Sequence, residues 1–170
     1  MNKIAVFGKP GSGKSVLSKS LSSALGLELY PLDSMLYDQE GQPVERTTFD
    51  KLHQTILMKD SWIIDGLGPL RAFNERLERA DTLIYVDLPY WLSYWLVTKR
   101  LIKSPFVHPE GWPKNSSVVT GTVNSYKTLQ LCPKFWNDEF VARVQALGKD
   151  KNVYVVKTLG ELNSFVALHT

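Results

Sequence analysis

Cysteine is almost absent from this chain of 170 residues, because Cys132 is the only one. A lone cysteine excludes an internal disulfide and suits a reducing compartment, so we expect a cytoplasmic protein. No apolar run approaches the roughly 18 residues of a membrane-spanning helix, so we expect no membrane partner. The net charge is only +3, and no Lys/Arg cluster or RNA-binding motif accompanies it. Nucleic acid is therefore not an expected partner either.

A phosphate-binding motif stands near the start of the chain. Residues 8–15, GKPGSGKS, fit the pattern G-x-x-x-x-G-K-[ST], between an apolar strand pattern over 4–7 and a helix pattern over 15–25. Its glycines allow backbone conformations in which successive N–H groups point at an anion. We expect Lys14 to contact the β- and γ-phosphates of ATP, and the Ser15 hydroxyl to hold Mg²⁺. The predicted nucleotide-binding residues are Gly8, Lys9, Pro10, Gly11, Ser12, Gly13, Lys14, Ser15, Val16 and Arg100.

Strand and helix patterns alternate along the whole chain. The strands are expected at 4–7, 27–30, 62–65, 82–87 and 153–156. The helices are expected at 15–25, 48–59, 70–79, 90–102, 118–131, 134–147 and 159–168. This alternation predicts one α/β domain over residues 1–170, a parallel sheet with helices on both faces. Residues 104–121, rich in proline and glycine, are expected to form a mobile lid or insert loop.

Three aspartates follow predicted strands, where ligands of open parallel sheets bind. Asp65 ends an apolar run before a glycine, as a Walker B carboxylate does, and we expect it to orient Mg²⁺ through the water shell of the ion. Asp87 has the same local form and is the competing candidate; for either, capping of the next helix is the alternative role. Asp33 could orient an acceptor hydroxyl or act as its general base, or it could bond its own backbone.

Arginines are the expected source of further positive charge for phosphoryl transfer. Arg71 and Arg76 come soon after the Asp65 strand, on the expected surface of a helix, and are candidates to clamp the acceptor. Arg100, at the end of the helix over 90–102, is placed to close on ATP. Each of these arginines could equally be a solvated surface charge. The predicted catalytic set is Lys14, Asp33, Arg71, Arg76 and Arg100, with Ser15 and Asp65 on the metal.

The tryptophans suggest packing more than base stacking. Trp62, Trp91 and Trp95 fall at core-like positions of predicted elements, so we expect them to be buried. Trp112 lies in the predicted lid, and it is the one tryptophan that we expect near a substrate.

Several of these motifs resemble those of known kinases. The phosphate loop looks like that of the adenylate kinase and shikimate kinase superfamily, and residues 65–71, DGLGPLR, are similar to the Asp-Gly-Phe-Pro-Arg stretch of adenylate kinases with two extra residues. Residues 32–37 and 62–66, LDSMLY and WIIDG, resemble motifs of bacterial adenylate-kinase-like proteins labelled FlaR-type or DNA topology modulation proteins. The resemblance implies a P-loop NTPase core with three α/β/α layers, a five-stranded parallel sheet of order 2-3-1-4-5, and a nucleoside monophosphate kinase-like architecture.

The same resemblance implies ATP, Mg²⁺ and transfer of the γ-phosphoryl group to a small acceptor. We expect this acceptor to be a nucleoside monophosphate or a nucleoside-like molecule. One departure concerns the lid, because Leu96 stands at an expected arginine position and residues 101–142 contain no arginine. Adenylate kinases clamp phosphates with lid arginines, and lysine cannot replace their bidentate geometry. Two alternatives therefore stay open: a sugar, acid or polyol kinase with Asp33 as base, and an ATP-binding regulatory module with weak ATPase activity.

Overall fold

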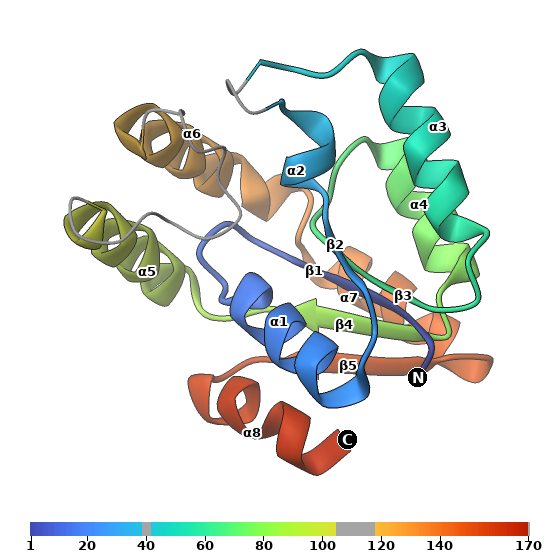
Figure 1. Ribbon diagram of the computed structural model, residues 1–170. Helices are drawn as coiled ribbons and strands as arrows, with labels where there is room; N and C mark the ends of the chain where they lie inside the picture. The colour runs from blue at the N-terminus through green and yellow to red at the C-terminus, as the bar shows by residue number, and fades with distance from the viewer. Residues whose placement is uncertain (39–41, 105–117, 170) are drawn as a thin grey trace.

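The computed structural model describes residues 1–38, 42–104 and 118–169, and its strands and helices alternate along the chain (Figure 1). The strands are β1 (Lys3–Gly8), β2 (Leu29–Pro31), β3 (Trp62–Asp65), β4 (Thr82–Val86) and β5 (Asn152–Val156). The helices are α1 (Lys14–Leu25), α2 (Asp33–Leu36), α3 (Arg46–Leu57), α4 (Leu70–Arg79), α5 (Tyr90–Lys103), α6 (Val118–Leu131), α7 (Asp138–Ala146) and α8 (Leu159–His169). Within the described ranges, no helix is both long and apolar enough to cross a membrane.

The five strands form one parallel sheet of order β2-β3-β1-β4-β5, which confirms the predicted fold and strand order. β1 lies in the middle and pairs with β3 on one side and β4 on the other. The register sets Val6 opposite Asp65 and Gly8 opposite Val86. The carboxyl ends of β3 and β4 therefore flank the segment that leaves β1, which is the phosphate loop.

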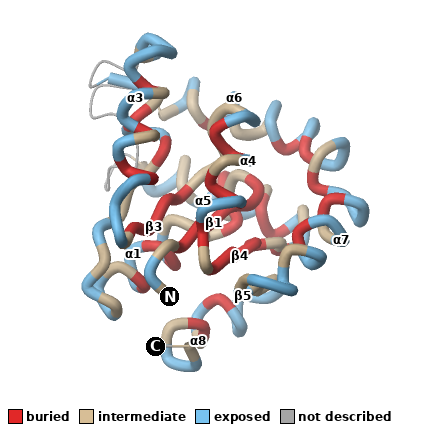
Figure 2. Tube along the Cα trace, turned by 90° about the vertical axis from the view of Figure 1, so that its right-hand side faces the viewer, coloured by how far each residue is buried: buried red, intermediate tan, exposed pale blue. Residues whose placement is uncertain are grey.

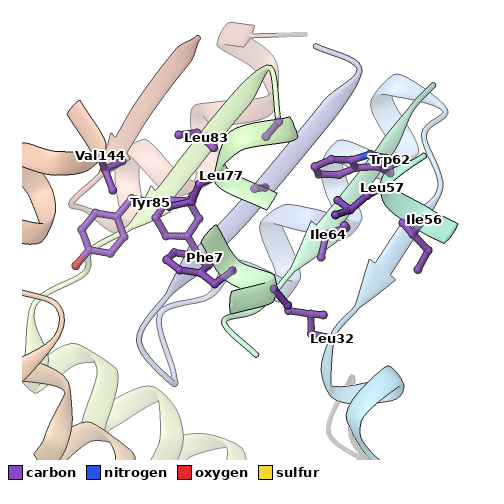
Figure 3. Close-up of a cluster of buried hydrophobic side chains, with 14 of the residues drawn as sticks. Phe7, Leu32, Ile56, Leu57, Trp62, Ile64, Leu77, Leu83, Tyr85 and Val144 are labelled. Carbon is purple, nitrogen blue, oxygen red and sulfur yellow. The ribbon is translucent and has the colours of Figure 1, made fainter. Parts of the chain in front are cut away.

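Both faces of the sheet are covered, so strands β3 and β4 are buried along their whole length (Figure 2). Successive residues of β1 point to opposite faces: Ala5 and Phe7 join one apolar cluster, and Ile4 and Val6 join the other. The first cluster is completed by α3, α4 and α7, and Figure 3 shows part of it around Phe7. The second cluster is completed by α1, α8 and the start of α5.

Several boundaries differ from those that the sequence predicts. β2 begins at Leu29 rather than at residue 27, and the short helix α2 covers residues for which no helix was predicted. The predicted helix 134–147 begins only at Asp138, because residues 132–134 form a 3-10 turn and the Asn137 side chain caps α7 by accepting a hydrogen bond from Phe140 N at 2.9 Å. Of the predicted lid 104–121, residues 118–121 are the first turn of α6, and residues 105–117 lie outside the described ranges.

Two of the tryptophan predictions are wrong. Trp62 is fully buried as expected, but Trp91 and Trp95 on α5 are 70% and 55% exposed. The buried side of α5 is the one that carries Leu92, Ser93 and Val97, so residues 91 and 95, four positions apart, share the solvent side. Trp112 lies outside the described residues.

Candidate active site

The loop between β1 and α1 is closely packed on two sides. Gly11 and Gly13 have φ angles of 69° and 82°, a conformation that side chains with a Cβ rarely adopt. A Cβ at Gly11 would lie 2.5 Å from the carbonyl oxygen of Ser93 in α5, and one at Gly13 would lie 2.7 Å from Leu162 Cδ2 in α8. Conformation therefore favours glycine at both positions, and the backbone of α5 leaves no space for a Cβ at Gly11. The loop is in close contact with α5 at Gly11 and with α8 at Gly13.

Hydrogen bonds within the loop place the start of α1. Lys9 O accepts a hydrogen bond from Ser12 N at 3.3 Å and a longer one from Lys14 Nζ at 3.5 Å. α1 begins at Lys14, and no side chain of the described residues caps it. The N–H groups of its first turn and its positive dipole end are thus directed at the loop, as in sites that bind phosphate.

Asp65 lies at the end of β3 with only 6% of its surface exposed. Burial raises the pKa of its carboxyl group, while the charge of Lys14 and a hydrogen bond from Ser15 lower it; the charge of Asp33 raises that pKa and the charge of Arg76 lowers it. Asp65 Oδ1 has no hydrogen-bond partner among the described residues. The structure therefore places four of the predicted site residues, Lys14, Ser15, Asp33 and Arg76, within electrostatic range of the buried carboxylate of the fifth, Asp65.

Asp87, at the end of β4, has different neighbours. Its Oδ1 forms an ion pair with Lys9 Nζ and accepts a hydrogen bond from Tyr85 Oη at 3.0 Å. Lys9 Nζ also lies 4.5 Å from the ring centre of Tyr90. We predicted Lys9 to be a nucleotide-binding residue, but its side chain is buried between Asp87 and Tyr90. Its backbone carbonyl is the group that forms hydrogen bonds within the loop.

Arg76 is not on the helix surface, and that expectation is wrong. It is 1% exposed, and its NH2 donates hydrogen bonds to the carbonyl oxygens of Gly66, at 3.0 Å, and Leu67. Burial lowers the pKa of its guanidinium to about 9, an effect that the charge of Asp65 opposes. Arg76 NH1 has no hydrogen-bond partner among the described residues. Arg76 thus stabilises the turn after β3 through these two hydrogen bonds.

The other two arginines lie on different helices, Arg71 on α4 and Arg100 on α5. Arg71 is exposed and paired: its NH2 lies 2.8 Å from Asp50 Oδ2, and its NH1 lies 3.7 Å from Glu75 Oε1. Arg100 NH2 donates a hydrogen bond to Ser125 Oγ of α6 at 3.1 Å. Burial lowers the pKa of Arg100 and the charge of Asp33 raises it. Arg100 therefore lies within electrostatic range of Asp33, whereas Arg71 belongs to the α3–α4 contact.

Sequence reasoning missed some of these partners. The stripe of Ala72, Phe73 and Leu77 could have placed Arg76 on the buried face of α4, since residues four apart share a face. No local signal links Lys9 to Asp87, which is 78 positions away, or Arg100 to Ser125.

Neither a protein-family model nor a curated protein sequence matches this chain. Solved structures do match it in fold. A shikimate kinase from Acinetobacter baumannii in complex with shikimate has 14% sequence identity and a TM-score of 0.57, over 99% of this chain and 90% of that one. A sugar kinase from Janibacter has 13% identity and a TM-score of 0.51, over 97% and 90%. A shikimate kinase from Bacteroides thetaiotaomicron has 13% identity and a TM-score of 0.51, over 97% and 94%. The chain therefore has the fold of P-loop kinases.

Proposed function

We propose that this protein is an ATP- and Mg²⁺-dependent phosphotransferase, a P-loop kinase that moves the γ-phosphoryl group of ATP to a small acceptor. The observation that carries the proposal is the gathering of Lys14, Ser15, Asp33 and Asp65 at the carboxyl edge of the sheet, beside a closely packed phosphate loop. The similar structures include shikimate kinases and a sugar kinase, which supports the same class of reaction.

The proposed nucleotide site would bind phosphate through positive charge and through hydrogen-bond donors that the fold holds in place. The first-turn N–H groups of α1 and the loop backbone would bind phosphate oxygens. Among the described residues, Lys14 Nζ donates a long hydrogen bond of 3.5 Å to Lys9 O, and a shorter charge-assisted contact with a phosphate oxygen would be stronger. Because the loop is already held by α5 and α8, little reorganisation is needed when charge develops in the transition state.

The residues around Asp65 fit Mg²⁺. A hydroxyl and a carboxylate are hard oxygen ligands, and Asp65 Oδ1 is buried without a partner among the described residues. Ser15 would hold the ion, and Asp65 would orient its water shell. Mg²⁺, when bound, neutralises negative charge on the phosphates. The described residues hold no cluster of three or more His, Cys, Asp or Glu side chains suited to a metal, so this site would be shared with the nucleotide, as is common for Mg²⁺.

Asp33 and Arg100 would act on the acceptor side. Asp33 would orient the acceptor hydroxyl and accept its proton, and Arg100 would stabilise charge on the transferred group. Arg71 is engaged by two carboxylates, and Arg76 by two carbonyl groups. This engagement leaves fewer cations for an acceptor phosphate, so it favours a hydroxyl acceptor, a nucleoside or a sugar, acid or polyol, over a nucleoside monophosphate.

The test is a screen of ADP release from Mg-ATP against nucleosides, nucleoside monophosphates and small hydroxylated metabolites. We expect one acceptor class to raise turnover at least about 10²-fold over the rate without acceptor. Lys14→Ala should abolish this turnover, and Lys149→Ala, a change of an exposed lysine just before β5, should leave it unchanged. If ATP binds and every acceptor leaves the rate at background, the kinase assignment fails and the regulatory module replaces it.

A further inference from the structure

We propose that Asp87 is a positioning residue for the phosphate loop: through the buried side chain of Lys9, it fixes the carbonyl group to which Ser12 N and Lys14 Nζ bond. This inference rests on the proposed nucleotide-binding function and concerns a residue that the chemistry itself does not use. It assigns Asp87 a role other than that of a second candidate for the metal.

The Lys9 ammonium has little access to solvent. The side chains of Lys9 and Asp87 are 2% and 26% exposed, and they form an ion pair. The Tyr85 hydroxyl donates to the same carboxylate oxygen, and the Tyr90 ring covers Lys9 Nζ at 4.5 Å. A buried ammonium is unfavourable unless a carboxylate compensates it, so Asp87 is what keeps Lys9 in this position.

Asp87 is itself held firmly. Its backbone N donates to Val156 O of β5 at 2.8 Å. Tyr85, which donates to its carboxylate, is stacked on Trp136 and on Phe7, with ring centres 5.2 Å and 5.7 Å apart. The carboxylate is therefore attached to the interior of the sheet rather than to a surface turn, and it is a fixed reference point for the loop.

The register explains why Asp87 meets Lys9. Val86 is opposite Gly8, so the next residue of each segment, Asp87 and Lys9, leaves the sheet at the same level. The Lys9 carbonyl then accepts the two hydrogen bonds from Ser12 N and Lys14 Nζ. A shift of the Lys9 backbone would thus also move Lys14, the lysine proposed to bind the phosphates. The Lys9 side chain itself would contact no ligand.

The experiment is a double-mutant cycle with a binding readout. Wild type, Asp87→Asn, Lys9→Met and Lys9→Met/Asp87→Asn are compared by calorimetric titration with Mg-ADP, with thermal unfolding measured on the same samples. Asp87→Asn leaves the Lys9 charge uncompensated, so we expect its Kd to rise at least about 10-fold. The double variant has no buried charge in this place, and we expect its Kd to return to within about 3-fold of wild type.

Asp81→Asn is the matched control at the other end of β4. The Asp81 carboxylate accepts hydrogen bonds from the backbone N of Asn2, at 2.8 Å, and of Lys3, at 2.9 Å, so its loss should lower the melting temperature without changing Kd. Should Asp87→Asn not fold, Asp87→Glu keeps the charge but displaces the carboxylate, and we expect its Kd to rise about 3-fold.

The outcomes separate the two proposals. An unchanged Kd in Asp87→Asn or, if that variant does not fold, in Asp87→Glu would overturn the positioning role while leaving the proposed function intact. The positioning role would equally be overturned if Asp81→Asn weakened binding as much as Asp87→Asn for the same loss of melting temperature, or if the double variant bound no better than Asp87→Asn. A wild-type protein that does not bind Mg-ADP would overturn both proposals.

Discussion

Asp65 and Asp87 occupy matching places on the two sides of β1, yet their surroundings differ. Each follows a buried parallel strand, and the two strands are the two neighbours of β1. Asp65 is opposite Val6, and the nearby hydroxyl of Ser15 at the start of α1 lowers the pKa of its carboxyl group. Asp87 follows Val86, which is opposite Gly8, and it forms an ion pair with the ammonium of Lys9. The two carboxylates therefore have different partners, and we assign Asp65 to the proposed metal side of the loop and Asp87 to the proposed support of the loop.

The largest expected effect comes from exchanging each carboxylate for an amide. Asp65→Asn should lower kcat/KM by at least about 10²-fold, because it removes the charge proposed to orient Mg²⁺. Asp87→Asn should instead lower the free energy of unfolding by about 3 kcal/mol, since Lys9 is left buried and unpaired. Steady-state kinetics and urea unfolding of both variants test this contrast, and equal losses of stability in the two variants would contradict it.

The pH dependence of stability sharpens the same contrast. Burial raises the pKa of Asp65 in the folded protein above its pKa in the unfolded chain. At a pH above both pKa values, the buried ionised carboxylate therefore lowers the free energy of unfolding. This loss disappears as the pH falls below the pKa of the unfolded chain. Asp65→Asn should therefore be at least as stable as wild type at pH 7.5, and the difference should shrink towards pH 4. Thermal melts at both pH values measure it, and a variant less stable than wild type at pH 7.5 would show that Asp65 stabilises the fold.

A smaller effect is expected when the loop is disturbed from the α5 side. In Gly11→Ala, the new Cβ meets Ser93 O in a backbone conformation with φ of 69°, so we expect a loss of about 1–3 kcal/mol in stability and weaker nucleotide binding. Gly26→Ala is the matched control, because Gly26 has a φ of 65° and nothing lies within 4 Å of the added Cβ. It should cost about 1 kcal/mol and leave the Kd for Mg-ADP unchanged. Equal Kd values for both variants would show that α5 does not constrain the loop.

The smallest effect is expected at Arg71. Arg71→Gln removes an exposed ion pair with Asp50 and should change stability by less than about 1 kcal/mol. With a hydroxyl acceptor, KM for the acceptor should change by less than about 3-fold. A rise of about 10-fold or more in that KM would show that Arg71 binds the acceptor after all, and would favour a monophosphate.

The phosphate-loop half of the site is the half that local sequence predicts well. The octet at residues 8–15, strand β3 and helix α4 lie where the sequence patterns predict them, because local turn chemistry and apolar periodicity decide them. The proposed acceptor half depends on tertiary packing. Helix α2 is too short to show a periodic pattern, and the burial of Arg76 depends on the phase of α4 against the sheet.

A local sequence pattern likewise does not predict which distant residue a side chain contacts. Asp65 and Asp87 have the same local sequence form, and only the strand register separates their neighbours. The same holds for Arg100, whose hydrogen-bond partner Ser125 lies on the next helix. These pairings form only when distant segments meet in the folded chain, so the local sequence does not reveal the partners of these side chains.

The most direct test is the Mg²⁺ dependence of ADP binding in wild type, Asp65→Asn and Asp87→Asn. The ratio of the Kd for ADP without Mg²⁺ to the Kd with Mg²⁺ separates the contribution of the metal from that of the loop. Our account predicts that this ratio falls to near one in Asp65→Asn and keeps its wild-type value in Asp87→Asn, although both Kd values of the latter rise. A preserved ratio in Asp65→Asn, or a ratio lost only in Asp87→Asn, would contradict the assignment of Asp65 to the metal side of the loop.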